Sequence, residues 1–198
     1  MIRERISDFR SGSLVPENPR VSVVIPAYGI APYVRETLES VFAQTFESFE
    51  VIVINDGSPD SDELERELEP FRERIVYGRQ ENLGASRARN SAICLSRAPI
   101  IAFLDGDDIW EPEFLASQVA YMESHKLDMV YCDAHLFGQD LFEGDLFSRA
   151  SPSRGAVTTE SLISATCNVI TSGTVLRRAA LDKTNLFDVS LTRMQDFD

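Results

Sequence analysis

Three short turns carry most of the chemistry that this sequence could perform. Two are acidic, at 56–58 (Asp-Gly-Ser) and 105–108 (Asp-Gly-Asp-Asp), and the third contains Ala27 and Tyr28. Closely spaced carboxylates repel one another unless a cation screens them, and carboxylate oxygen atoms are ligands that suit Mg²⁺ and Mn²⁺. A metal held in this way can bind a diphosphate and stabilise it as a leaving group.

Each of these turns also has an ordinary structural explanation. Asp-Gly pairs are common turn formers, so an isolated Asp-x-Asp is mostly a solvated turn, and Asp56 alone would be a turn residue. Tyr28 alone would be half-buried packing, and Trp110 is expected in the core rather than against a ligand. The combination of all three turns, each after a buried strand, favours a binding site.

The chain alternates apolar, largely β-branched runs with segments of helical spacing. Strands that are apolar throughout and separated by helices indicate a parallel sheet covered on both faces. The sequence therefore predicts an α/β fold with a mostly parallel sheet and helices on both faces. The expected strands are 21–26, 50–55, 75–78, 100–104 and 129–132, and the expected helices are 34–45, 60–71, 83–97 and 111–123.

The order of these elements predicts where a ligand would bind. In open α/β sheets, ligands lie at the carboxyl ends of strands, where the strand order reverses. If strands 21–26 and 100–104 are neighbours, the three turns meet in one crevice that contains an aromatic ring and several carboxylates.

Both ends of the chain are less regular than its centre. Residues 1–20 are polar with mixed charges, and we expect an N-terminal extension with at most one short amphipathic helix. We expect a loop at 137–154, one or two strands at 168–176 and a helical turn at 177–181. The pattern at 187–198 predicts the start of a helix, and this unfinished helix suggests a fragment of a longer protein.

Composition limits the partners and the compartment. The 198 residues include 19 basic and 32 acidic side chains, a net charge of −13, and so acidic a surface repels nucleic acid. The 3 cysteines form no C-x-x-C pair, no zinc-ligand spacing is present, and the 2 histidines are too few for most metal-site or catalytic-triad chemistry. No apolar run approaches ~18 residues, and no signal-peptide core is present. We expect a cytoplasmic protein without a transmembrane segment in this chain.

Five segments together resemble the inverting glycosyltransferases of family 2, which have the GT-A fold. They are 21–28 (VSVVIPAY), 38–46 (LESVFAQTF), 50–58 (EVIVINDGS), 82–90 (NLGASRARN) and 101–112 (IAFLDGDDIWEP). The segments occur in the order and spacing of the family. The resemblance is good over 21–135 and weaker afterwards, where 173–177, 187–188 and 195–198 are similar to the acceptor-side pattern.

The resemblance implies a domain organisation. Residues 21–198 would form a GT-A glycosyltransferase domain that follows the extension at 1–20. Within it, 21–135 would be the nucleotide-sugar-binding half. Residues 136–198 would be the acceptor-side half, which we expect to be truncated.

The resemblance also implies which residues bind the nucleotide of the donor. Ala27 and Tyr28 would line the nucleobase pocket, with the tyrosine ring stacked on the base. Asp56 would accept the imide N–H of uracil or thymine, because a carboxylate is an acceptor only. Arg89 would lie near the donor, or else cap its helix or form a salt bridge for it.

Two further aspartates would bind the metal, and a third would act in the reaction. Asp105 would contact the ribose and the metal, and Asp107 would be the direct ligand of a divalent ion, Mn²⁺ or Mg²⁺. Asp196 would be the general base, removing the proton of the acceptor hydroxyl as its oxygen attacks the anomeric carbon opposite the departing nucleotide diphosphate.

The implied activity is metal-dependent, inverting transfer of a sugar from a UDP- or dTDP-type donor to an acceptor hydroxyl. The resemblance implies a role in cell-surface polysaccharide or glycoconjugate synthesis, with a saccharide or a lipid-linked acceptor. A lipid-linked acceptor would bring the protein into peripheral contact with the inner face of the membrane.

Three residues depart from the pattern of the family. Asn55 stands where an acid is common in the nucleobase turn, but the binding acid Asp56 is kept. Gly29 stands where asparagine is common after Tyr28. Gln195 replaces a glutamate and removes a charge beside Asp196.

Three other functions fit parts of the sequence. A non-catalytic nucleotide-sugar-binding module or an inactive fragment would keep the acidic turns without turnover. A nucleotidyltransferase would need a glycine-rich, basic loop after the first strand, whereas 27–32 has one glycine and no basic residue. A receiver-type domain could place acids at strand ends but would not explain segment 82–90.

Overall fold

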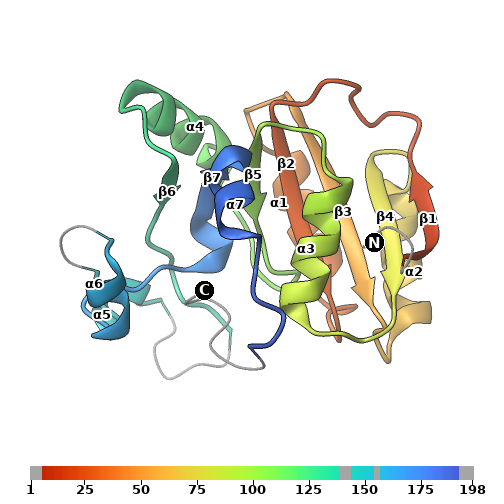
Figure 1. Ribbon diagram of the computed structural model, residues 1–198. Helices are drawn as coiled ribbons and strands as arrows, with labels where there is room; N and C mark the ends of the chain where they lie inside the picture. Colours follow the sequence, from red (N-terminus) through yellow and green to blue (C-terminus); the bar gives the residue numbers. More distant parts are fainter. Residues whose placement is uncertain (1–5, 139–143, 154–156, 192–198) are drawn as a thin grey trace.

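The computed structural model describes residues 6–138, 144–153 and 157–191, and its centre is one seven-stranded sheet (Figure 1). The strand order is β1-β4-β3-β2-β5-β7-β6. Strands β2 to β5 run parallel, whereas β7 is antiparallel to both β5 and β6, and β1 is antiparallel to β4. The strands are β1 (Ser7–Ser11), β2 (Val21–Ala27), β3 (Phe49–Asp56), β4 (Ile75–Gln80), β5 (Ile100–Phe103), β6 (Met129–Tyr131) and β7 (Thr174–Arg177).

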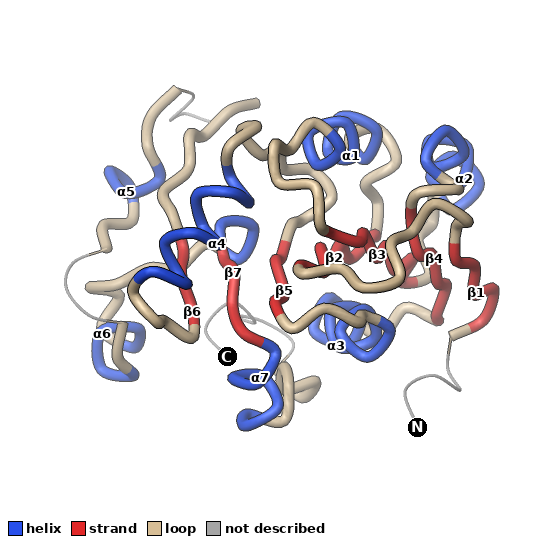
Figure 2. Tube along the Cα trace, turned by 90° about the horizontal axis from the view of Figure 1, so that it is seen from above, coloured by secondary structure: helices blue, strands red, loops and turns tan. Residues whose placement is uncertain are grey.

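Helices cover both faces of this sheet. Figure 2 shows α1 and α2 on one face and α3 on the other. A short 3-10 turn, η2, follows α2, and a second one, η3, precedes β7. The helices are α1 (Val34–Phe42), α2 (Ser61–Leu68), α3 (Ala85–Leu95), α4 (Phe114–Ser124), α5 (Phe147–Ala150), α6 (Thr159–Ile163) and α7 (Arg178–Thr184), and the 3-10 turns are η2 (Glu69–Phe71) and η3 (Thr171–Gly173).

The central strands form because their apolar residues can be buried on both sides. In β2, Val21, Val23 and Ile25 enter the core beneath α1, α2 and α4, whereas Val24 enters the core beneath α3. Successive side chains of a strand point to opposite faces, so a run of apolar residues suits a sheet sandwiched between helices. The predicted α/β fold with a mostly parallel sheet is confirmed.

The N-terminal segment differs from the prediction of a short helix. Residues Ser7–Ser11 form the edge strand β1, which pairs antiparallel with β4. Its side chains are exposed, so the segment lacks the apolar periodicity that would identify a strand. Pairing with the free edge of β4 determines its conformation instead. Backbone bonds from Gly12 to Ile75 and from Leu14 to Glu73 extend this attachment.

The second half of the chain differs from the prediction at 137–154 and agrees with it at 168–176. Helix α5 lies within 137–154, where a loop is expected. Segment 168–176 contributes a single strand, β7, preceded by η3. Among the described helices, none is long and apolar enough to cross a membrane.

Candidate active site

The topology brings the three turns that contain Tyr28, Asp56 and Asp107 to one edge of the sheet. Strands β3, β2 and β5 are parallel neighbours, so their carboxyl ends lie together. From β2 the chain proceeds outward through β3 and β4, and β5 then pairs with the other side of β2. This reversal of strand order is where α/β sheets bind their ligands. The pairing of strands 21–26 and 100–104, the condition for the three turns to meet, is present in the structure.

Asp56 ends β3 and is held firmly in place. It is 2% exposed, and its Oδ1 atom accepts hydrogen bonds from the side chain of Gln80 (2.6 Å) and the backbone of Leu83 (3.0 Å). Its Oδ2 atom accepts one from the backbone of Gly84 (2.8 Å). Because a carboxylate oxygen can accept two hydrogen bonds, Oδ2 retains capacity for a further donor.

Gly57 allows this turn to pack closely against the segment before α3. Its φ angle is +64°, and an added Cβ would lie 2.6 Å from the backbone nitrogen of Asn82. Both the left-handed conformation and the close approach require glycine. The Asp-Gly pair is therefore a structural requirement of the turn as well as a source of its carboxylate.

Tyr28 lies on the loop after β2, and the register of the sheet pairs the preceding residue, Ala27, with Asn55. Ala27 is fully buried, whereas Tyr28 is 52% exposed. The next residue, Gly29, has a φ angle of +68°. Glycine and asparagine are the residues that most readily adopt this conformation, which explains why glycine can stand where asparagine is common.

The loop that carries Tyr28 is bonded to the turn that carries Asp56. The backbone of Gly29 donates to Ser58 Oγ (2.7 Å), and the backbone of Ala31 donates to Asp60 Oδ2 (3.0 Å). Ser58 in turn donates to the Asp60 carboxylate. The sequence did not reveal that Ser58 and Asp60 connect these two segments, although both residues lie within four positions of Asp56.

The connection between the two segments depends on pH through the carboxylate of Asp60. Burial alone would raise the pKa of Asp60, but hydrogen bonds from Ser58 and from backbone N–H groups outweigh it and hold the pKa below its usual value. A pKa lowered on folding stabilises the fold above the unfolded pKa of the group. This stabilisation is lost as the pH falls through the folded pKa.

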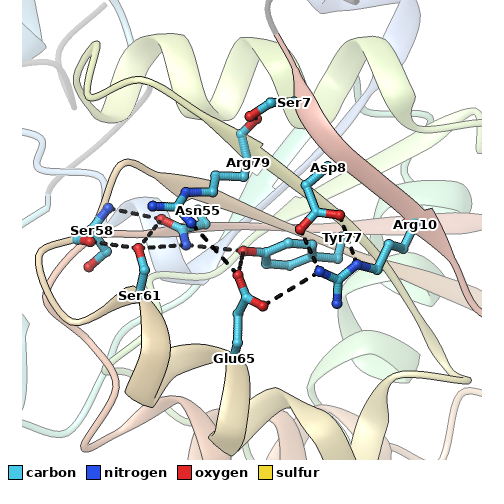
Figure 3. A network of polar contacts seen from close by, with 9 residues as sticks. All are labelled: Ser7, Asp8, Arg10, Asn55, Ser58, Ser61, Glu65, Tyr77 and Arg79. Atoms are coloured by element: carbon cyan, nitrogen blue, oxygen red, sulfur yellow. Dashed lines mark hydrogen bonds and ion pairs between the residues drawn. The ribbon is translucent and has the colours of Figure 1, made fainter.

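Asn55 lies in a network of polar contacts next to the turn at 56–58 (Figure 3). Its buried amide donates to Tyr77 Oη and to Ser61 Oγ, both at 3.0 Å, and its Oδ1 atom accepts from the backbone of Ser58 (2.9 Å). Tyr77 donates its own proton to Glu65 (3.1 Å). The position therefore needs a donor toward Tyr77, which an amide supplies and an ionised carboxylate does not.

The acidic turn after β5 presents its aspartates in three different ways. Asp105 is partly buried and pairs with Arg89 of α3, whose Nη2 atom lies 2.7 Å from Asp105 Oδ1. Asp107 is exposed. Asp108 accepts a hydrogen bond from Ser172 of η3. Burial raises the pKa of Asp108; the bond from Ser172 opposes this, and the charges of Asp105 and Asp107 add to it.

Arg89 thus forms an ion pair with an acid of the candidate site, which agrees with the salt-bridge alternative for this residue. Its side chain is only 5% exposed, whereas that of Asp105 is 36% exposed. The buried guanidinium offsets one of the clustered negative charges at the edge of the sheet.

The carboxylates of the acidic turn suit a divalent ion that is shared with a ligand. Within the described residues, no group of three or more histidine, cysteine, aspartate or glutamate side chains is arranged to hold a metal alone. Mg²⁺ commonly takes one or two protein carboxylates and completes its shell with substrate phosphates and water. The exposed Asp107 and the partly exposed Asp105 fit this donor set. Asp196 and Gln195 lie outside the described residues.

Trp110 is a core residue, as predicted. It is 7% exposed, and its ring stacks on Phe114 with 4.3 Å between the centroids. Its indole N–H donates to the carbonyl of Ser172 (2.7 Å). Ser172 was not predicted, although it directly precedes the segment 173–177 that resembles the acceptor-side pattern.

The fold and its reversal of strand order define the class of the protein as an α/β domain of the kind that binds ligands at the carboxyl ends of its strands. A sequence model described as Glycosyl transferase family 2 matches residues 22–184. The chain therefore belongs to glycosyl transferase family 2.

Individual relatives agree with this assignment. The succinoglycan biosynthesis protein ExoW of Rhizobium meliloti is 41% identical over 128 residues, which cover 62% of this chain and 40% of ExoW. The structure of TarS 1–349 of S. aureus in complex with UDP aligns with a TM-score of 0.69 at 22% identity, covering 90% of this chain and 53% of that one. The mannosyltransferase PcManGT of Pyrobaculum calidifontis, in complex with GDP-Man and Mn²⁺, aligns with a TM-score of 0.66 at 18% identity, covering 93% and 52%.

The structural similarity establishes the GT-A fold. The chain spans about half the length of these structures and less than half of ExoW.

Proposed function

We propose that this chain binds a nucleotide-diphosphate sugar and transfers the sugar to an acceptor hydroxyl, with inversion at the anomeric carbon and with the help of a divalent metal. The observation that carries the proposal is the convergence of Tyr28, Asp56, Asp105 and Asp107 at the carboxyl ends of three neighbouring strands. The family assignment supports transfer of a glycosyl group as the reaction.

In this proposal the nucleoside occupies the space between the loop after β2 and the turn after β3. The half-exposed Tyr28 ring stacks on the base, and Ala27 lines the pocket. Asp56 Oδ2 accepts the imide N–H of the base. This contact favours uracil or thymine, because cytosine and adenine lack an imide N–H. The bonds through Ser58 and Asp60 keep the two walls of the pocket at a fixed separation.

The diphosphate lies beside the acidic turn after β5. Asp107, and Asp105 on the ribose side, would hold Mn²⁺ or Mg²⁺. When bound, the metal neutralises the charge that develops on the leaving diphosphate. Arg89 keeps Asp105 oriented and partly neutralised.

Asp196 is proposed as the general base. Its carboxylate takes the proton from the acceptor hydroxyl while that oxygen forms the new bond to the anomeric carbon. The bond between that carbon and the diphosphate oxygen breaks on the opposite face. The configuration is therefore inverted, and no covalent enzyme intermediate forms.

The wider role is proposed from the relatives. ExoW is named for succinoglycan biosynthesis, which supports a saccharide or lipid-linked acceptor in cell-surface polysaccharide synthesis. We place the protein in the cytoplasm, in peripheral contact with the membrane when the acceptor is lipid-linked. A non-catalytic nucleotide-sugar-binding module is the alternative, and it predicts binding without turnover.

The Asp56→Ala variant is expected to weaken uridine binding by about 1–3 kcal/mol, the range for a hydrogen bond to a charged group. Calorimetric titration with uridine measures this change. The Asp56→Asn variant should also bind uridine more weakly, because an NH2 group replaces one carboxylate oxygen and faces either the N–H of Gly84 at Oδ2 or the donors of Gln80 and Leu83 at Oδ1. Uridine affinity equal to that of the wild type in Asp56→Ala would remove Asp56 from the nucleobase pocket.

The reaction itself is tested by release of nucleoside diphosphate from a panel of UDP-, dTDP- and GDP-sugars, with Mn²⁺ and mixed saccharide acceptors. Turnover is expected for the wild type, and Asp196→Asn is expected to abolish turnover while sparing UDP binding, because the amide cannot accept the proton. Equal turnover in Asp196→Asn would exclude this residue as the base. Binding without turnover in the wild type would favour the non-catalytic module.

A further inference from the structure

Ser172 joins the second half of the chain to both sides of the acidic turn after β5. Its Oγ atom accepts a hydrogen bond from the backbone of Asp105 (3.0 Å) and donates one to the carboxylate of Asp108. Its carbonyl accepts the indole N–H of Trp110 (2.7 Å). Ser172 is 7% exposed, so these bonds are shielded from water.

Only a hydroxyl fits the two Oγ contacts. The Asp105 backbone N–H needs an acceptor, and the Asp108 carboxylate needs a donor. A hydroxyl supplies both functions from one atom. An apolar side chain at position 172 would leave a partly buried carboxylate and a backbone donor without these partners.

The same turn is fixed from the first half of the chain as well. Thr37 of α1 donates from Oγ1 to the carbonyl of Gly106 (2.9 Å). A Cβ on Gly106 would lie 2.2 Å from the side chain of Ile30, so the turn is packed tightly against the loop after β2. Asp107 lies between these anchored residues and is exposed.

We propose that Ser172 is a positioning residue for the metal-binding turn, which orients Asp107 toward the donor diphosphate and keeps the Asp108 carboxylate turned away from the metal. This inference rests on the proposed function of the crevice. Ser172 touches neither donor nor metal in this account and acts through Asp105 and Asp108. It lies on the side of the chain that resembles the acceptor-binding pattern, and so links that side to the donor site.

The Ser172→Ala variant should weaken metal-dependent binding of the diphosphate and leave nucleoside binding unchanged. Trp110 is the single tryptophan of the chain, and it follows this turn by two residues. Its fluorescence, quenched by paramagnetic Mn²⁺, can therefore report binding of UDP with Mn²⁺, and calorimetry reports binding of uridine alone. Loss of outer-shell partners of a metal typically costs 10- to 100-fold in affinity, so the UDP midpoint should rise by about 10-fold or more.

Two controls separate positioning from general stability. Ser22→Ala also removes a buried hydroxyl that donates to a carboxylate, that of Glu50, and accepts a backbone N–H, that of Ala98, but at the far end of β2. It should leave both affinities unchanged. Ser172→Thr and Ser172→Val form a nearly isosteric pair that differs in the hydroxyl, and only Ser172→Thr should retain UDP binding with Mn²⁺.

The proposal is overturned if Ser172→Ala and Ser172→Val bind UDP with Mn²⁺ as the wild type does. It is also overturned if they lose uridine and UDP affinity equally, since this would indicate a general structural defect. If the wild-type chain binds neither uridine nor UDP, both the proposed function and the positioning role of Ser172 are wrong. The titration of the wild type thus tests the proposed function. The ratio of the UDP affinity of each variant to that of the wild type tests the role of Ser172.

Discussion

Replacing Asp107 with alanine is expected to weaken UDP binding in the presence of Mn²⁺ by about 100-fold or more, because a direct ligand should matter at least as much as outer-shell partners do. Asp107 is the exposed carboxylate of a turn whose other residues are held by Ser172, Thr37 and Arg89. Under the proposed function, its removal would leave a bound metal with Asp105 alone, and one oxygen of Asp105 already pairs with Arg89. Calorimetry with and without Mn²⁺ measures the change.

The matched control is Asp128→Ala. Asp128 is also exposed, and it precedes β6, which runs in the same direction as β5, so it lies at the opposite edge of the sheet. Both variants change the net charge equally, and only Asp107→Ala should lose metal-dependent binding. Similar UDP affinities in Asp107→Ala and the wild type would contradict the assignment of Asp107 as a metal ligand.

The Glu50→Ala variant is expected to lower the free energy of unfolding by about 2–4 kcal/mol. The Glu50 side chain is fully buried in β3, and its carboxylate accepts hydrogen bonds from Ser22 Oγ (2.7 Å), the Arg97 backbone (2.6 Å) and Arg97 Nε (2.9 Å). Alanine leaves the buried donors without an acceptor and opens a cavity. The Arg97 side chain is 43% exposed and can be rehydrated, which limits the loss.

Urea denaturation measures this loss, with Glu67→Ala as the comparison. Glu67 forms an ion pair with Arg35 at 2.6 Å, but both side chains are substantially exposed. Exposed pairs contribute less than about 1 kcal/mol, so this variant should remain close to the wild type. Equal destabilisation by the two substitutions would refute the structural importance assigned to Glu50.

The central sheet could be predicted from the sequence because its strands are continuous apolar runs. Segments such as 21–26 and 50–55 fit only strands buried on both faces, and the helices between them require parallel pairing. Strand β1 could not be predicted in this way. Its five residues are exposed and include one apolar side chain, Phe9, so they show no apolar periodicity. The conformation of β1 depends on pairing with β4, more than 60 residues away in the sequence.

The candidate site could be predicted as far as its carboxylates and its aromatic ring, because they directly follow predicted strands. The residues that hold these side chains in position could not be predicted. The bond between Ser172 and Asp105 spans 67 residues, and Ser172 is an ordinary serine in sequence terms. Asn55, a departure from the family pattern, became explicable only when its contacts with Tyr77 and Ser61 were known.

Calorimetric titration of the chain with UDP, dTDP and GDP, each with and without Mn²⁺, shows directly whether it binds a nucleoside diphosphate through a metal. We expect UDP or dTDP to bind with a strong dependence on Mn²⁺, because Asp56 would accept the imide N–H and Asp107 would hold the metal that contacts the diphosphate. Binding of none of the three nucleotides, or binding that is indifferent to Mn²⁺, would contradict this expectation.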